Sequence, residues 1–386
     1  MSLQRISRSR GLTLLEVMIG MAIGLIGIVI IAQVYLVNEN YKRSTTGAGG
    51  AQVNGAIALY TMERDLRMAG YGVNNASALE CGQIQYYYNG TYSSPPGAPG
   101  GLMPVVLAPV VITDGGVGAP DSVTALYGNP ADRTTLASLS KVMLTADADL
   151  DVDNPTGFSF VPGGTGDLAI LSQGGVCTLI QVTDVEMSAL RIKHNSGVNA
   201  PWNPAPGGSF SAYATGATLF NLGRPTVNTY SINASNLRLL SVFTSTSTTV
   251  VPSYNATPVA IVNDIVDLQA QYGKDNGIDN GTVVNAGGVY NAGDGIVDSY
   301  DSVTPINATD WKQVLSVRLG VMARSQNYEK PEPAGAACTA TTTTPTWAGS
   351  GPPGSTANFT VPDGLPSCYK YLVFETVVPL RNMLWR

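Results

Sequence analysis

One stretch rich in aspartate, asparagine and glycine is the part of this sequence with the clearest capacity for chemistry. Asp275, Asp279, Asp294 and Asp298 form two Asp-x3-Asp pairs, and glycines near them allow sharp turns. Carboxylate and carbonyl oxygens are the ligands that Ca²⁺ takes, about six to eight at a time. Calcium is therefore a candidate cofactor here, and no other cofactor is indicated. The alternative is a solvated turn, because Asp, Asn and Gly are ordinary turn residues.

A second acidic group at 147–154 carries aspartates at alternate positions. On a strand these carboxylates would share one face and repel each other, whereas in a loop they could surround a cation. Neither acidic group has the glycine and twelfth-position glutamate of an EF-hand. Calcium therefore stays an open alternative at both, slightly better supported at 275–298.

Other catalytic chemistry has little support in the sequence. His194 is the single histidine, and no G-x-S-x-G, Walker A, H-E-x-x-H or G-x-G-x-x-G motif occurs. The net charge of −6 argues against nucleic acid as a direct partner, because phosphate binding needs a basic face. A membrane-anchored enzyme is therefore the weakest functional hypothesis, and we expect a protein that is not an enzyme.

The chain begins with a basic segment followed by a long apolar run. Arg5, Arg8 and Arg10 precede Leu12–Leu36, in which Glu16 is the only charged residue. A helix of that length rises about 37 Å, enough to cross a hydrocarbon core of about 30 Å. The run is too long for a secretory signal and has no A-x-A-like site after it. Arginines on the N-terminal side predict a cytoplasmic N-terminus, an inner-membrane single pass and a periplasmic remainder.

Four cysteines, an even number, lie on the side expected to be translocated: Cys81, Cys177, Cys338 and Cys368. No C-x-x-C pair occurs, which gives little support to a zinc or thioredoxin-like site. In an oxidising compartment they predict two disulfides, for which three connectivities are possible. We favour Cys81–Cys177 and Cys338–Cys368, because the second bond would tie a Thr/Gly/Pro-rich loop to the last strand.

The segment Arg10–Val17, with the sequence RGLTLLEV, resembles the cleavage motif of the type IV prepilin family. The resemblance implies that prepilin peptidase cuts after Gly11 and that Leu12 becomes the N-methylated first residue. Leu12 stands where the family usually has phenylalanine. Glu16 falls at the fifth mature position, which implies pairing with the positive N-terminus of a neighbouring subunit. The chain would then divide into a leader at 1–11, a helix at 12–70 and a head at 71–386.

Blocks near both ends of the chain are similar to the PilW minor pilins within that family: 63–71, 266–273, 311–324 and 377–382. This similarity implies a minor pilin that acts in pilus assembly and priming at the tip. Its partners would be other minor and major pilins, prepilin peptidase and the assembly platform, and its final location the cell-surface pilus. Two alternatives are a J-type pseudopilin of type II secretion, a smaller class of protein, and a tip adhesin with calcium-dependent loops.

Periodicity predicts an α+β fold, in which a long transmembrane and amphipathic helix packs on one elaborated antiparallel β-rich head. In the helix, Val53, Ile57 and Tyr60 share one face, and three glycines within 44–50 predict a kink or melted turn. Gly70 and Gly72 should end it. Long polar or Gly/Pro-rich segments at 274–305 and 331–366 should be surface loops. We expect strands at Gln83–Tyr88, Val105–Thr113, Ser122–Tyr127, Asp167–Ser172, Cys177–Thr183, Ala217–Leu222, Val227–Asn233, Leu237–Phe243, Val266–Tyr272, Val317–Val321 and Tyr369–Val378.

Overall fold

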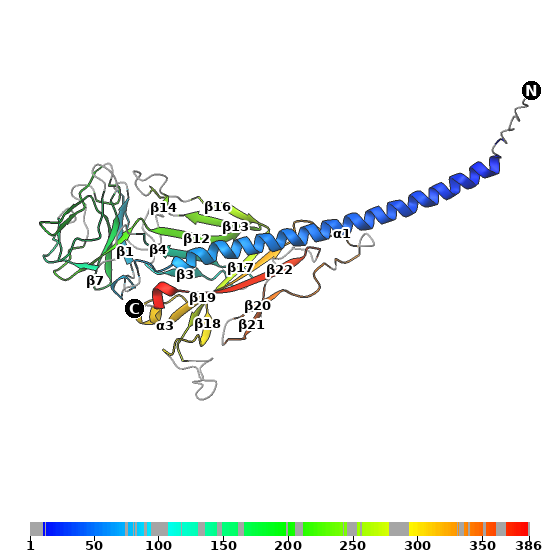
Figure 1. Cartoon of the computed structure of the whole chain (residues 1–386). Coiled ribbons are helices and arrows are strands. Elements are labelled where there is room, and N and C mark those ends of the chain that lie inside the picture. Colours follow the sequence, from blue (N-terminus) through cyan, green and yellow to red (C-terminus); the bar gives the residue numbers. More distant parts are fainter. Residues whose placement is uncertain are drawn as a thin grey trace, which may run out of the picture.

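The computed structural model describes most of the chain and confirms the α+β class (Figure 1). The described residues are 11, 13–73, 76–79, 81, 83–88, 91–93, 107–116, 118–129, 136–144, 149–160, 166–197, 200–204, 211–241, 243–244, 253–254, 257–277, 293–329, 331, 336–338, 340–349, 353–359 and 368–384. Of the residues singled out above, Leu12, Asp279 and most of the leader lie outside this set.

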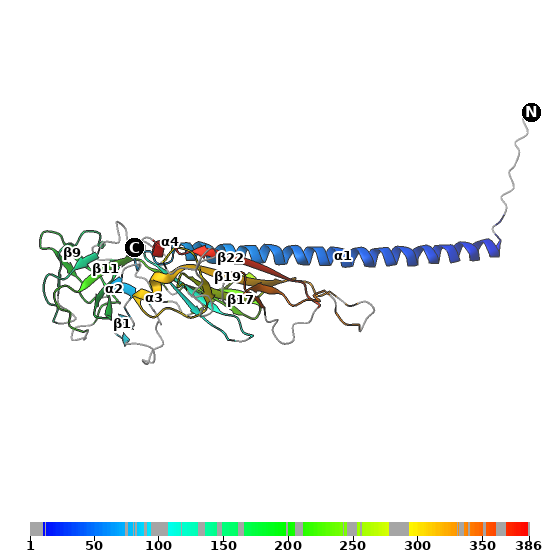
Figure 2. The ribbon, with the colours of Figure 1, turned by 90° about the horizontal axis from the view of Figure 1, so that it is seen from below.

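Helix α1 (Leu14–Met68) is a single helix of 55 residues, and its N-terminal half extends away from the rest of the chain (Figures 1 and 2). Within the described residues it is the helix long and apolar enough to cross a membrane, and its most apolar stretch has no buried residue. The helix ends just before Gly70 and Gly72, both with a φ of +83°. These glycines adopt the left-handed conformation that favours glycine after a helix.

Two antiparallel sheets pack around the C-terminal half of α1 and form the helix-proximal lobe of the head. The four-stranded sheet has the order β18 (Ser299–Asp301), β17 (Ile265–Lys274), β19 (Val314–Arg324) and β22 (Tyr371–Pro379). The five-stranded sheet has the order β16 (Val259–Asn263), β13 (Asn236–Ser241), β12 (Thr226–Asn233), β4 (Ser122–Tyr127) and β3 (Val110–Thr113).

A distal lobe lies beyond the C-terminal end of α1 (Figures 1 and 2). Its six-stranded sheet has the order β2 (Thr91–Ser93), β1 (Gln83–Tyr88), β8 (Val176–Gln181), β7 (Leu168–Gln173), β11 (Thr218–Gly223) and β5 (Leu136–Ser138). A small sheet of β6 (Leu150–Asp151), β10 (Arg191–Lys193) and β9 (Asp184–Glu186) accompanies it. The lobe has one apolar cluster of its own, and a second cluster joins it to the five-stranded sheet through Leu126 and Val227. Strand β1 pairs with β8 in parallel. The head is thus β-rich as expected, but it is built in two lobes and is not wholly antiparallel.

Short elements complete the fold. They are α2 (Ala76–Leu79), α3 (Ala308–Gln313), α4 (Arg381–Leu384) and the pairs β14 (Phe243–Thr244) with β15 (Ser253–Tyr254) and β20 (Thr346–Ala348) with β21 (Thr356–Asn358). The hairpin of β20 and β21 lies inside the segment predicted to be a long surface loop. It packs its apolar side chains on the four-stranded sheet.

The kink predicted at 44–50 is wrong, because α1 runs through these residues without a break. Two glycines of the helix instead allow close packing. A Cβ added at Gly55 would lie 2.2 Å from the ring of Phe374, and one at Gly47 would lie 3.3 Å from the Cβ of Ser325. The head braces the helix at these positions, and this packing offsets the low helix propensity of glycine.

Candidate functional site

The N-terminus of α1 holds the residues assigned to processing and assembly. Thr13 is the N-cap, and Glu16 closes a capping box with it. The Glu16 carboxylate accepts hydrogen bonds from the backbone N–H of Thr13 at 2.9 Å and from its hydroxyl at 3.0 Å. In return, the Glu16 N–H donates to the Thr13 hydroxyl at 3.3 Å. Gly11 is exposed and lies just before the helix.

Helix α1 exposes apolar side chains far beyond its first turns. Nearly all of the side chains between Leu14 and Leu36 are exposed, and further along Val53, Ile57 and Tyr60 are 57%, 48% and 68% exposed. Soluble monomers rarely show apolar surfaces of this extent, and such surfaces mark membrane or protein contacts. Up to Ala58, the large apolar residues of the amphipathic half therefore face away from the head, which packs against the small ones: Gly47, Ala51, Gly55 and Ala58. Near the end of the helix the large Met62 and Leu66 are buried against the head as well.

Asp65 anchors the end of α1 to the head. The residue is 1% exposed, and its carboxylate accepts hydrogen bonds from Asn228 Nδ2 and from the Tyr230 hydroxyl, each at 2.6 Å. The Tyr127 hydroxyl lies 3.4 Å from the second carboxylate oxygen. Burial, together with the Asp65 carboxylate, raises the pKa of both tyrosines above their ordinary value. The sequence offered one signal for this anchor, an acid on the same helix face as Ala58 and Met62.

The acidic stretch at 275–298 is held together by its own backbone at the described positions. Asp275 is buried and accepts hydrogen bonds from the N–H groups of Gly293 at 2.6 Å and Gly295 at 2.8 Å. Asp298, also buried, accepts one from the N–H of Gly277. The two aspartates thus clamp the two ends of the loop.

Calcium at this loop stays a prediction. Asp294 is exposed and accepts a hydrogen bond from the Ile296 N–H at 2.9 Å, while Asp279 lies outside the described residues. Within the part of the chain that the structure describes, no three His, Cys, Asp or Glu residues gather to hold a metal. A shift in the melting of the protein with calcium would support the prediction, and no shift at millimolar calcium would count against it.

The second acidic group forms ion pairs with basic residues. Arg191 of β10 lies 3.2 Å from Asp151 and 3.5 Å from Asp149, and Lys141 lies 3.2 Å from Asp151. Burial alone would raise the pKa of Asp151, but hydrogen bonds from Lys141 and Arg191 hold it below its ordinary value. Asp153 accepts a hydrogen bond from the N–H of Ser138. These contacts give the group a structural role in the distal lobe.

The disulfides have the pairing favoured from the sequence. Cys81 is bonded to Cys177, with 5.7 Å between their Cα atoms, and ties the start of β1 to β8 in the distal lobe. Cys338 is bonded to Cys368, with 4.7 Å between their Cα atoms, and closes the connection from β19 to β22. The second bond closes the segment that contains the β20–β21 hairpin.

Two known families match the chain. The prokaryotic N-terminal methylation motif matches residues 6–32, which include the membrane-length part of α1. The family described as Type IV Pilus-assembly protein W matches residues 229–382, from β12 to α4. A type IV-like pilin from Thermus thermophilus is similar in structure with a TM-score of 0.34 and 11% identity, over 86% of this chain and 96% of that chain. A similarity this low does not establish a shared fold or function. No curated protein matches the chain significantly.

The long apolar helix and the methylation motif at its start are similar to those of type IV pilins, and here they precede a β-rich head. The second match adds the particular kind. Over residues 229–382, which are less than half of the chain, it is similar to the Type IV Pilus-assembly protein W family.

Proposed function

We propose that this chain is a minor pilin that primes pilus assembly at the tip. It enters the inner membrane with its N-terminus in the cytoplasm and its head in the periplasm. Prepilin peptidase cuts after Gly11, and Leu12 is then N-methylated. The mature subunit joins other minor and major pilins at the assembly platform. One observation carries this proposal: the methylation motif stands at the start of a helix whose apolar half is not covered by the head.

The exposed apolar half of α1 is suited to two environments, the membrane and the interior of the filament. Lipid covers the apolar residues while the subunit is in the membrane, and the helices of neighbouring subunits cover them in the filament. Lipid and helix surfaces are similarly apolar, so transfer between the two depends on packing and on polar contacts. The role of the protein is structural, and its processing is done by the peptidase and not by the chain itself.

Glu16 supplies the main polar contact in this scheme. A carboxylate in hydrocarbon is unfavourable by several kcal/mol unless it has a partner. Before cleavage, its hydrogen bonds to Thr13 cap its own helix. Cleavage after Gly11 creates a positive N-terminus on each subunit. Pairing of Glu16 with the N-terminus of a neighbour would fix the register of the two helices.

Replacement of this carboxylate tests the proposal. We expect Glu16→Ala to be processed to the mature size and to remain in the membrane, but to be absent from sheared pili. Glu39→Ala, on the same helix beyond the membrane-length segment, is the matched control and should be incorporated normally. Normal amounts of the Glu16→Ala subunit in pili would contradict the assembly role.

A further inference from the structure

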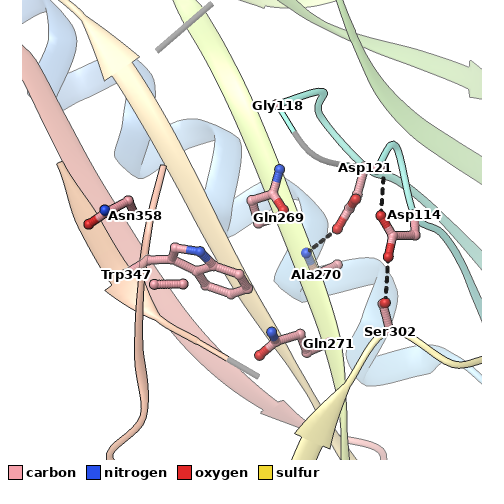
Figure 3. Close-up of a pocket in the computed structure, with 11 residues that line it drawn as sticks. Asp114, Gly118, Asp121, Gln269, Ala270, Gln271, Ser302, Trp347 and Asn358 are labelled. Atoms are coloured by element: carbon pink, nitrogen blue, oxygen red, sulfur yellow. Dashed lines mark hydrogen bonds between the residues drawn. The ribbon is translucent and has the colours of Figure 1, made fainter. Parts of the chain in front are cut away.

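A polar pocket lies on the face of the four-stranded sheet that is turned away from α1 (Figure 3). Its volume is about 240 Å³. Strand β17 forms the floor, the β20–β21 hairpin forms one wall, and the connection from β3 to β4 forms the opposite wall. The side chains that define it are Gln269, Gln271, Trp347, Asn358, Asp114 and Asp121.

The tryptophan wall is fixed by packing against the sheet. Gly320 of β19 leaves room for the indole, because a Cβ there would lie 2.8 Å from the ring of Trp347. The indole also packs against Phe359, with 5.8 Å between ring centroids, and both join a buried cluster with Val266 and Met322. The Cys338–Cys368 bond closes this segment. Trp347 is therefore held in place before any ligand arrives.

The opposite wall presents two fixed carboxylates. Asp114 accepts hydrogen bonds from the hydroxyl of Ser302 and from the N–H of Gly116, each at 2.7 Å. These bonds lower its pKa, so the group is charged at neutral pH. Asp121 accepts hydrogen bonds from the N–H groups of Gly115 at 2.9 Å and Ala270 at 2.8 Å. A carboxylate has about four acceptor sites, so each aspartate keeps acceptor capacity for a ligand.

The amide of Gln269 is oriented by its own hydrogen bonds. Its Nε2 donates to Asp267 at 3.0 Å and to the carbonyl of Ala119 at 3.2 Å. Both donor hydrogens are used, and the Oε1 atom accepts no hydrogen bond from the residues that the structure describes. Across the pocket, the exposed Asn358 offers a donor and an acceptor together. The pocket therefore combines fixed acceptors, an adaptable amide and an aromatic surface.

We infer that this pocket binds a single sugar ring, such as the terminal unit of a glycan. Hydroxyl groups donate to the carboxylates and to the Gln269 carbonyl, and they also accept from the Asn358 amide. The apolar C–H groups of a sugar can contact the edge of the Trp347 indole, which is 5% exposed at the pocket. The volume is below the range of about 300 to 1,000 Å³ for drug-sized ligands and suits one ring.

Two other ligand classes fit the pocket less well. An anion would meet two carboxylates at close range. A divalent cation takes about six or more oxygen ligands, and no metal-binding group of three occurs among the described residues. Because the pocket is on the side of the sheet opposite α1, membrane or subunits packed along the helix would leave it open. This binding activity goes beyond the assembly role proposed above.

Saturation-transfer NMR on the full chain tests the inference. The protein is held in a detergent without a sugar headgroup and offered galactose, glucose, mannose and N-acetylglucosamine separately, with ethanolamine as a cationic probe. We expect millimolar binding of at least one sugar. Asp114→Asn and Asn358→Ala should each weaken that binding about tenfold, since each removes one ligand contact.

A matched variant controls for folding. Asp294 lies outside the pocket. Like Asp114, it accepts a hydrogen bond from the backbone N–H of the residue two positions further along the chain, so Asp294→Asn makes the same chemical change away from the pocket. It should bind the sugar as the unchanged chain does. Asn358 is exposed, so its replacement leaves the fold intact. Absence of binding by all four sugars, binding by the Asp114→Asn and Asn358→Ala variants equal to that of the unchanged chain, or binding of ethanolamine alone would overturn the inference.

Discussion

The two faces of the four-stranded sheet differ in chemical character. Toward α1, strands β17 and β19 present an apolar core that includes Leu268, Tyr272 and Leu319. On the opposite face, under the β20–β21 hairpin, the same strands present buried polar groups. Arg318 lies 3.3 Å above the ring of Tyr300, and Asp267 hydrogen-bonds to Gln269.

The two faces of this sheet therefore differ in chemistry: one packs on the helix, and the other presents polar groups. The helix side packs on small residues of α1 with tight contacts, and the end of α1 is held to the five-stranded sheet through the buried Asp65. The outer side holds polar groups at fixed positions, which is the condition for binding a polar ligand. Substitutions on the helix side should therefore change stability, whereas those on the outer side should also change pH dependence.

The largest effect should come from Asp65→Ala on the helix side. The change leaves the Asn228 amide and the Tyr230 hydroxyl buried without their common acceptor. We expect a loss of about 3 kcal/mol in the free energy of unfolding, measured by denaturant unfolding in detergent. Arg64→Ala, at the mostly exposed neighbour, is the control and should change it little. Equal midpoints for the two variants would show that Asp65 is not an anchor.

Two glycine substitutions in α1 should change the stability of the protein in opposite directions. Gly55→Ala places a Cβ against Phe374, and overpacking of this kind lowers stability by about 1 to 3 kcal/mol. At Gly49 a Cβ would have no neighbour within 4 Å, so Gly49→Ala should raise stability by about 1 kcal/mol through helix propensity. Melting temperatures of the two variants measure the contrast. A rise in both would mean that the helix does not press on the head at Gly55.

On the outer face, Asp267 should make stability depend on pH. Burial, with a contribution from the charge of Asp121, raises the pKa of Asp267 to about 6. Between about pH 4 and pH 6 the folded chain therefore keeps a proton that the unfolded chain has lost, so stability falls as pH rises through this range. Asp267→Asn should remove that fall and be more stable at pH 7, by up to about 3 kcal/mol.

Denaturant unfolding at pH 4.5 and pH 7 measures this difference. Other carboxylates titrate in both proteins, so their contributions cancel when the variant is compared with the unchanged chain. If the stability of Asp267→Asn and of the unchanged chain depended on pH in the same way, the Asp267 carboxylate would be in contact with water. The distinction between the two faces would then be weaker.

The sequence predicted what depends on local pattern. The strands at Gln83–Tyr88 and Ser122–Tyr127 are found with those bounds, and α1 ends before Gly70 as expected. The N-terminal motif was recognisable because its residues are contiguous. The match to the methylation motif at residues 6–32 agrees with it, and the match at 229–382 includes the blocks near the C-terminal end that resembled PilW.

Features that depend on packing between distant segments were not predictable. The glycines of α1 indicated a kink because of their low helix propensity. Their contacts with Ser325 and Phe374 come from segments 278 and 319 residues away, which the local sequence does not show. The segment at 331–366 looked like a loop, yet Trp347 and Phe359 fold onto the sheet beside Gly320. The pocket joins three such segments, and no local pattern in any of them indicates it.

Mass spectrometry of the N-terminus tests the central claim most directly. The mature protein should be extracted from membranes and from sheared pili, digested, and its first peptide sequenced. The account predicts a chain that begins with N-methylated Leu12 in both fractions. A chain that keeps Met1, or that begins at a residue other than Leu12, would contradict the account.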